Sequence, residues 1–452
     1  MIDVEPINLN TMRRAIVWFK NDLRLQDNET LQKAVEWADE IIPVFCYNEN
    51  WDTQTQFGTK KIGKHRKQFL FQSMMELEEQ LAERNSGLVF CKGNPIHEIL
   101  RLAKLYNAQR VYAKKEVAYE EITELKNLNE QLLKSGITLE LYSTSTLYHA
   151  TDLPFSIRDI PEMFTNFRKQ VEKDSIVRNE INTPDNFKSP QLEKVNWSDY
   201  FTPIKNDERA SFHFIGGENQ ANKRLTEFIQ AGHINHYKQK RDQLYGANYS
   251  SKFSPWLALG CISPRTIYHH IKNFENQYGA NDSTYWLIFE LIWRDFFRFS
   301  FKKHPRDFFL QQGISKKTIE FSHNKNNFVA WKNSETVQNL INAFMNELKE
   351  TGFMSNRGRQ IVASYFIYEL KCDWRYGASW FEEQLIDYDP CSNWGNWAYI
   401  AGVGNDPRGG RIFNIDKQAE QFDKDFSFRN KWLSILSSEK SSNNIESNTI
   451  KT

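Results

Sequence analysis

The sequence predicts an α/β N-terminal domain built on a doubly wound, parallel, five-stranded sheet, followed by an all-α C-terminal domain. Over residues 13–145, short apolar runs rich in β-formers alternate with longer helical segments. From Gly216 to about Leu436 the pattern is almost wholly helical. Hydrophobic residues make up 40% of the chain and charged residues 25%, which excludes wholesale disorder. We therefore expect domains at 13–145 and 216–436, an interdomain connector at 146–215 and a disordered tail at 437–452.

Strands and helices are expected to alternate through the first domain. The strands are predicted at Ala15–Phe19, Ile41–Tyr47, Leu88–Cys91, Arg110–Ala113 and Thr138–Tyr142. The helices between them are predicted at Glu29–Ala38, Lys60–Arg84, Ile96–Tyr106 and Glu120–Lys134. This alternation indicates βαβ units with helices on both faces of the sheet. No G-x-G-x-x-G follows the first strand, so a dinucleotide held by a glycine-rich turn is not indicated there.

The connector is polar and interrupted by prolines, with a short helix predicted near Phe164–Glu172. Residues 1–12 are interpreted as a loose lead without the apolar core of a signal peptide. No apolar run is long enough to span a bilayer, so no membrane association is expected. The five cysteines show neither close pairing nor metal-ligand spacing, which predicts free thiols, no metal site and a cytoplasmic location.

Net charge gives no support for nucleic-acid binding, because the formal value is only +1 and a binding site would need a local basic patch. Aromatic residues reach 14%, and nine of the 13 tryptophans lie at or after Trp256. These rings fit either a large core or a pocket around a flat ring system, and composition favours the core.

Several segments carry residues suited to chemistry. Ser250, Ser251, Lys252, Phe253 and Ser254 precede a helix expected to start near Pro255, where hydroxyls, a lysine and free backbone N–H groups suit a phosphate. An ordinary helix N-cap explains this segment equally simply, and for a lone signal it is the favoured interpretation.

A helix over residues 290–298 would place Glu290, Trp293, Arg294 and Phe297 on one face. That face suits a polar ligand, although a solvated ion pair beside a core tryptophan would give the same pattern.

Two further segments, Gly352–Gln360 and Leu385–Tyr399, could meet through a buried Arg–Asp bridge. Asp387, Asp389 and Asn393 could contact a polar ligand edge, whereas a solvated turn before Pro390 is the alternative for the two aspartates.

Taken together, these segments resemble the photolyase/cryptochrome flavoproteins, most closely the cryptochrome DASH branch. The resemblance rests on Val17–Leu25, Ser250–Leu257, Glu290–Arg294, Met354–Gln360, Ile386–Trp397 and Arg411–Asn414. It implies a flavin adenine dinucleotide (FAD) bound in a folded conformation deep in the helical domain. It also implies light-driven repair, in which an electron from excited, reduced flavin splits a cyclobutane pyrimidine dimer.

The resemblance also assigns roles to residues. For the cofactor, Tyr237 and Ser250–Ser254 would hold the diphosphate and ribityl region. Arg359 and Asp387 would pair beside the isoalloxazine. Asp389 would contact the adenosine side or flavin edge, and Asn393 would sit at flavin N5. The cofactor pocket would also include Glu290, Trp293, Arg294, Phe297 and Asn356. The lesion cavity would be lined by Glu290, Trp293, Asn356, Arg357, Gln360 and Tyr399, with Arg294 and Arg357 also serving nearby phosphates. Lys302, Lys303, Arg306, Arg408 and Arg411 are further candidates for strand phosphates.

The implied partner is single-stranded DNA carrying pyrimidine dimers, because a damaged base leaves the stack at lower cost. A methenyltetrahydrofolate antenna is implied near Glu116, where Lys115 replaces an expected polar amide. We expect a monomer. A blue-light photoreceptor acting on a signalling partner is the alternative function. A third class, an aminoacyl-transferring enzyme, would need motifs that 232–235 and 353–356 do not match.

Two departures from the family pattern bear on activity. The flavin-reducing aromatic chain matches Trp397 and Trp374, but the outer position holds Phe321, which is harder to oxidise than tryptophan. After Trp331-Lys332, residues 333–343 lack the usual glycine, basic residue, proline and aspartate, which weakens the expectation of efficient repair and favours the photoreceptor hypothesis. Gln360 and Tyr399 are typical of DASH proteins at lesion-side positions.

Overall fold

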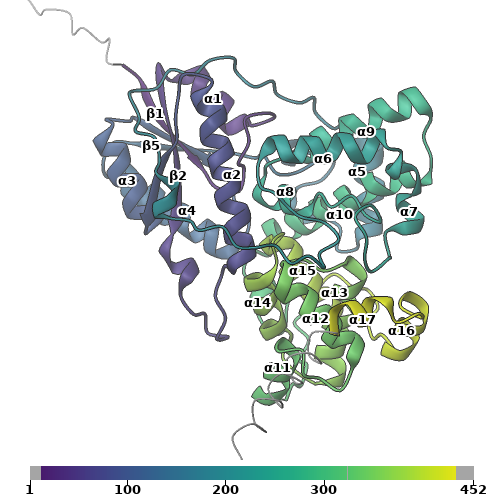
Figure 1. The fold of residues 1–452 in the computed structure, drawn as a ribbon. Helices are drawn as coiled ribbons and strands as arrows, with labels where there is room; N and C mark the ends of the chain where they lie inside the picture. The colour runs from purple at the N-terminus through teal and green to yellow at the C-terminus, as the bar shows by residue number, and fades with distance from the viewer. Residues whose placement is uncertain (1–11, 323, 434–452) are drawn as a thin grey trace, which may run out of the picture.

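The computed structural model describes residues 12–322 and 324–433 (Figure 1). The expected lead, apart from Met12, and the expected tail at 437–452 lie outside these described residues. Within them, an α/β layer structure is followed by a mostly helical part, as the sequence predicts. None of the described helices is both long and apolar enough to cross a membrane.

The five predicted strands are confirmed. They are β1 (Arg14–Phe19), β2 (Glu40–Asn48), β3 (Val89–Gly93), β4 (Arg110–Lys114) and β5 (Thr138–Tyr142). They form one parallel sheet in the order β3-β2-β1-β4-β5. The chain therefore starts at the centre, winds to one edge and returns to build the other half, so the doubly wound prediction is correct.

Helices cover both faces of the sheet (Figure 1). They are α1 (Glu29–Trp37), α2 (Lys64–Ala82), α3 (Pro95–Leu105) and α4 (Tyr119–Leu133). Successive β1 side chains point to opposite faces: Val17 packs in the cluster that includes Phe69 of α2, and Trp18 packs in the cluster that includes Leu102 of α3 and Leu128 of α4. Burial on both faces explains why the strands are almost continuously apolar.

The connector carries the predicted short helix, α5 (Phe164–Asp174), together with single turns of 3-10 helix. Its later part returns to the sheet, where Ile41 N donates to Lys188 O and Ser189 Oγ donates to Ile41 O. Phe167 of α5 packs on Phe296 in the helical part. The connector therefore contacts both the sheet and the helical part.

The remaining described chain is helical, apart from an isolated bridge between Ser322 and Cys372. Its longer helices are α6 (Glu218–Gln230), α9 (Pro264–Tyr278), α10 (Asp282–Lys303), α12 (Asn339–Thr351), α13 (Asn356–Ser364), α14 (Trp374–Gln384) and α15 (Pro390–Ala401). The shorter ones are α7 (Tyr237–Lys240), α8 (Ser254–Leu259), α11 (Lys325–Lys332), α16 (Ile415–Phe422) and α17 (Ser427–Leu433). Most of these helices share one apolar core rich in aromatic rings.

Buried polar contacts hold the sheet part against the helical part. Arg24 donates to the carbonyls of Gly260 and Thr144, and Glu218 accepts from the backbone N–H of Leu25. Gly260 has φ +67°, and a Cβ there would lie 2.3 Å from Asn21 O, so the two parts approach backbone to backbone. This contact fixes the carboxyl ends of the strands against the helical part.

Candidate functional site

Arg359, Asp387 and Ser254 converge from three separate segments. Arg359 Nη2 on α13 and Ser254 Oγ on α8 both donate to Asp387 Oδ2, at 2.8 and 2.6 Å. Asp387 is 7% exposed, and its other oxygen, Oδ1, is buried and has no hydrogen-bond partner among the described residues. The predicted Arg–Asp bridge therefore exists, and the solvated-turn alternative for Asp387 and for the 4%-exposed Asp389 is wrong.

The segment before α8 is not an ordinary N-cap. The cap residue is Phe253, which makes no side-chain capping bond, and the hydroxyl of Ser254 is used by Asp387 instead. Lys252 has φ +62° and is 4% exposed, with Nζ 3.6 Å from the ring centre of Tyr249. Burial lowers the pKa of Lys252 to about 7.

Glu347 on α12 is a functional candidate that the sequence analysis missed. It is 8% exposed, and its Oε2 has no partner within the part of the chain that the structure describes. Burial raises its pKa to about 8. The charge of Lys252 offsets part of this rise in the pKa of Glu347. A glutamate inside an amphipathic helix carries no sequence signal that separates it from a solvated surface residue.

These residues fit the dinucleotide that the resemblance implies. No carboxylate of a described residue bonds the buried amine of Lys252, which therefore suits a diphosphate, and Asp387 Oδ1 can accept from a ligand N–H or hydroxyl. Polar atoms left unpaired in the interior cost free energy unless a ligand or water satisfies them. Tyr237, also expected at the cofactor, is 8% exposed and packs edge-on against Phe228.

Asp389 is buried and accepts a hydrogen bond from α10, so it does not lie in a solvated turn. It caps α15 by accepting from Ser392 N and also accepts from Arg298 Nη1, both at 2.8 Å. Burial by itself would raise the pKa of Asp389, but the charges of Arg298 and Arg294 bring it below its usual value. Arg298 also lies 3.8 Å from Glu116, so one guanidinium links the helical part to the α/β part.

Asn393 and Trp397 lie one turn apart on α15. Asn393 Nδ2 donates to Ala378 O on α14 at 2.9 Å. The Trp397 ring stands edge-on to Phe366, Trp331 and Phe381, with centroids 5.1–6.1 Å apart. A Cβ on Gly377 would lie 2.3 Å from this ring, so α14 and α15 touch there.

Trp374 is fully buried at the start of α14. Its ring packs edge-on against Trp394 at 5.8 Å, and its Nε1 donates to Gln311 O. Phe321 lies close to the start of α14, because the next residue, Ser322, forms a β-bridge with Cys372, two residues before Trp374.

The residues expected at a lesion cavity gather around α10 and α13. Trp293 stacks face to face on Phe164 at 3.7 Å and stands edge-on to Tyr399 at 6.1 Å. Glu290 pairs with Arg241. Phe297 packs beside Trp293 at 5.7 Å.

Arg357 pairs with Asp242 at 3.2 Å and bonds Gln360 at 3.1 Å, and Asn356 begins the same helix. Sequence reasoning missed Phe164, Arg241 and Asp242, because their partners are distant in the chain.

Arg294 is placed differently from its neighbours. Its two terminal nitrogens donate to the carbonyls of Ser145 and Leu257, and burial lowers its pKa. In the structure this side chain therefore ties the end of the α/β part to α8 and α10. A contact of Arg294 with DNA phosphates stays a prediction.

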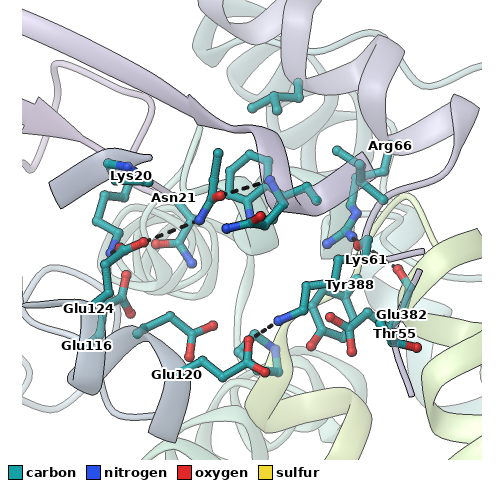
Figure 2. A pocket seen from close by; sticks show the side chains of 18 of the residues that line it. Lys20, Asn21, Thr55, Lys61, Arg66, Glu116, Glu120, Glu124, Glu382 and Tyr388 are labelled. Atoms are coloured by element: carbon teal, nitrogen blue, oxygen red, sulfur yellow. Dashed lines mark hydrogen bonds and ion pairs between the residues drawn. The ribbon is translucent and has the colours of Figure 1, made fainter. Parts of the chain in front are cut away.

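A second site is a cavity of about 520 Å³ between the two parts, at the carboxyl ends of the strands (Figure 2). Figure 2 shows Glu116, Glu120 and Glu124 on one wall, with Lys61 and Arg66 across from them. Ion pairs cross its rim: Glu124 bonds Lys20 at 2.8 Å, and Glu120 pairs with Lys61.

The carboxyl groups of this cavity differ in charge. Burial would raise the pKa of Glu116, but the cations Lys114, Lys20 and Arg298 hold it below its usual value, so the group stays ionised. Burial raises the pKa of Glu121 to about 7. Among the described residues, no group of His, Cys, Asp and Glu side chains has the geometry of a metal site.

Comparison with known proteins agrees with this geometry. Residues 15–187 match the family model described as DNA photolyase, and residues 286–451 match the FAD binding domain of DNA photolyase. Cryptochrome DASH of Synechocystis sp. is 44% identical over 427 residues, covering 93% of this chain and 87% of the relative. The chain belongs to the photolyase/cryptochrome family and is of the cryptochrome DASH type.

Other members extend this relationship. Cryptochrome DASH of Arabidopsis thaliana is 41% identical and covers 93% of this chain and 75% of its own. The crystal structure of the Synechocystis cryptochrome superposes with a TM-score of 0.90, covering 95% of this chain and 90% of that one. A class III photolyase from Agrobacterium tumefaciens, at 27% identity, gives a TM-score of 0.81 and covers 94% and 88%. The DASH fold thus accounts for both parts of the molecule.

Proposed function

We propose that this cryptochrome DASH is an FAD-dependent photolyase that repairs cyclobutane pyrimidine dimers in single-stranded DNA. The observation that carries the proposal is the surface around Trp293, whose ring is fixed on Phe164 beside Tyr399 and the partly exposed Glu290. A flat ring next to a carboxylate offers a flipped base both a stacking face and a hydrogen-bond acceptor. Asn356, Arg357 and Gln360 would complete this cavity.

FAD would be held by the cluster around Asp387. Lys252 and the hydroxyls of Ser250, Ser251 and Ser254 would contact the diphosphate and ribityl region with Tyr237 and Phe253. Arg359 and Asp387 would flank the isoalloxazine, with Asp389 and Asn393 nearby. Glu290, Trp293, Arg294, Phe297 and Asn356 complete the proposed pocket. When bound, the reduced flavin supplies one-electron chemistry driven by blue light.

The protein's own residues orient and tune this site. Asn393 is uncharged and buried, so it can donate to or accept from a ring nitrogen without supplying a proton. The Arg359–Asp387 bridge keeps a fixed charge pattern beside the ring. Trp397 and Trp374 would form the electron route from the interior.

A methenyltetrahydrofolate antenna is proposed for the 520 Å³ cavity. The support is chemical: an ionised Glu116 and the neighbouring carboxylates suit donor groups of a pterin ring and disfavour a phosphate. An archaeal photolyase from Sulfolobus tokodaii, with a TM-score of 0.78, was solved with two FAD molecules. Identification of the chromophore released from the purified protein distinguishes folate from a second flavin.

A blue-light photoreceptor that signals to a partner is the second candidate. The altered segment after Trp331 favours it. Ser334 there has φ +65°, and its buried hydroxyl bonds none of the described residues. Asn342 Oδ1 accepts from the backbone N–H and the hydroxyl of Thr336.

Repair and signalling are separated by one experiment. The FAD-loaded protein is illuminated with blue light, a thiol reductant and an oligothymidine that carries one dimer. Recovery of intact thymines supports repair, and complete persistence of the dimer supports signalling. The proposal also includes a monomer and a reducing, cytoplasmic setting. The five free, buried cysteines support the reducing setting.

A further inference from the structure

Glu290 and Arg241 form an ion pair at the surface that carries Trp293. Arg241 lies just after α7 and Glu290 lies on α10, and Arg241 Nη1 donates to Glu290 Oε1. The side chains are 21% and 31% exposed, so both ends of the pair reach solvent. The residue that the repair proposal needs as a base acceptor is therefore already engaged by a cation in the DNA-free protein.

A second ion pair lies next to the Arg241–Glu290 pair. Asp242, next to Arg241, pairs with Arg357 at 3.2 Å, and Arg357 also bonds Gln360. Arg241 Nε lies 4.0 Å from Asp242. Two guanidinium groups and two carboxylates thus neutralise one another on this surface, which leaves little net attraction for a polyanion.

A partly exposed ion pair is weak enough to exchange partners. A backbone phosphate is an alternative partner for Arg241, and a pyrimidine N–H is an alternative partner for Glu290. If Arg241 turned to a phosphate alone, the Glu290 carboxylate would be left unpaired beside a polyanion. The exchange is favourable only when a base reaches Glu290 at the same time. A dimer holds its two pyrimidines as one rigid unit, so it loses less conformational freedom on reaching Glu290 than two separate thymines do.

We propose that the Arg241–Glu290 ion pair is a specificity gate: an undamaged strand leaves it closed, and a dimer opens it by engaging Glu290, which frees Arg241 to bind a strand phosphate. This inference rests on the proposed DNA-repair function. Arg241 is a positioning and discrimination residue in this scheme, and it adds one phosphate contact for damaged strands only.

The salt dependence of binding measures that contact. For single strands, log K falls with log salt concentration by about 0.7 per neutralised phosphate. The FAD-loaded protein is titrated in darkness with oligothymidine, with and without one dimer, at several salt concentrations. In the wild type we expect the slope for the dimer strand to be steeper by about 0.7.

Variants of Glu290 and Arg241 test whether their ion pair causes this difference in slope between the two strands. Glu290→Gln should steepen the slope for undamaged oligothymidine by the same about 0.7 and abolish the difference between strands. Arg241→Gln should also abolish the difference, and adding Glu290→Gln to it should not change the slope. Glu172→Gln, which breaks the Arg168–Glu172 pair of similar exposure, is the control for lost charge and should leave both slopes unchanged.

The outcomes separate the two proposals. Equal slopes for both strands in the wild type, or a slope gain by Glu290→Gln that persists without Arg241, overturn the gate but not the repair function. Failure of the wild type to bind either strand overturns both. Flavin absorbance and circular dichroism of each variant establish that the fold and cofactor are intact.

Discussion

Arg359 and Asp387 lie 28 positions apart in the chain, yet their side chains meet at 2.8 Å. The pair joins α13 to the segment that leads into α15, and Ser254 adds a third segment through the same carboxylate oxygen. The carboxylate side chain is only 2% exposed, against 25% for the guanidinium. A buried charge of this kind costs more if its partner is removed than the intact pair contributes.

Replacing Asp387 by Asn should empty the flavin pocket. The change removes the charge that holds Arg359 and Ser254, so we expect the FAD content of the purified protein, measured by flavin absorbance, to fall by at least about tenfold, equivalent to about 1.4 kcal/mol. Asp423→Asn is a matched control, because Asp423 is buried and paired with Arg429 elsewhere. That control should lose stability but keep its flavin; equal FAD content in all three proteins would refute the role of Asp387.

The Lys252–Glu347 region predicts opposite pH effects on the stability of the cofactor-free protein. The pKa of Lys252 is about 7 in the folded protein and 10.5 in the unfolded chain, so the unfolded chain binds more protons between these values and stability rises with pH. Lys252→Met should remove a rise of about 2 kcal/mol over about two pH units above the folded-state pKa, measured by urea unfolding. An identical pH profile in the variant would argue against a buried neutral amine.

Glu347 should act in the opposite direction. Its pKa is about 8 in the folded protein against 4.5 in the unfolded chain, so the folded chain binds the extra proton and stability falls as pH rises through this window. Glu347→Gln should flatten the fall between these two pKa values. Because the charge of Glu347 raises the pKa of Lys252, the rise that depends on Lys252 should begin at a lower pH in this variant. A variant that falls as steeply as the wild type would contradict the assignment.

Trp397 should control the photoreduction of bound flavin. Trp397→Phe keeps a ring among Phe366, Trp331 and Phe381 but removes an oxidisable indole. We expect the rate of flavin bleaching under blue light with a thiol to fall at least about tenfold, a barrier change of about 1.4 kcal/mol. Trp432→Phe, on α17, should bleach at the wild-type rate; wild-type speed in Trp397→Phe would refute the route.

Phe321 offers a gain-of-function test. The bridge between Ser322 and Cys372 holds position 321 close to Trp374, and Phe321 is only partly buried. Phe321→Trp would place an oxidisable ring near solvent, so we expect faster photoreduction in the same bleaching assay. Phe328→Trp, on α11, controls for an added indole; an unchanged rate in Phe321→Trp would show that another residue already fills the outer position.

Glu116 should determine antenna binding. Glu116→Gln removes the ionised carboxylate from the cavity, so we expect the affinity for methenyltetrahydrofolate to fall about tenfold, or about 1.4 kcal/mol, with FAD content unchanged. Glu140→Gln is the control, because Glu140 pairs with Arg110 outside the cavity, and this variant should bind normally. Equilibrium dialysis measures both; equal affinities would place the folate elsewhere.

The sequence by itself determined the strand and helix order, because alternating apolar runs and periodic helices follow from local patterns such as Ala15–Phe19 and Thr138–Tyr142. It also indicated Arg359, Asp387 and Asn393, whose segments resemble a known family. The predicted bridge between Arg359 and Asp387 is confirmed. Whether these residues carry the proposed roles stays a prediction.

Only the tertiary structure decided the remaining contacts. Glu347 looks like a surface residue of an amphipathic helix until α12 packs, and Arg241, Asp242 and Phe164 have no local pattern that names Glu290, Arg357 or Trp293 as partners. Ion pairs and ring stacks between segments far apart in the chain depend on how helices cross. Burial shifts the pKa of titratable side chains and so decides which of them are charged. Periodicity reports the face a residue lies on, whereas packing decides what it meets there.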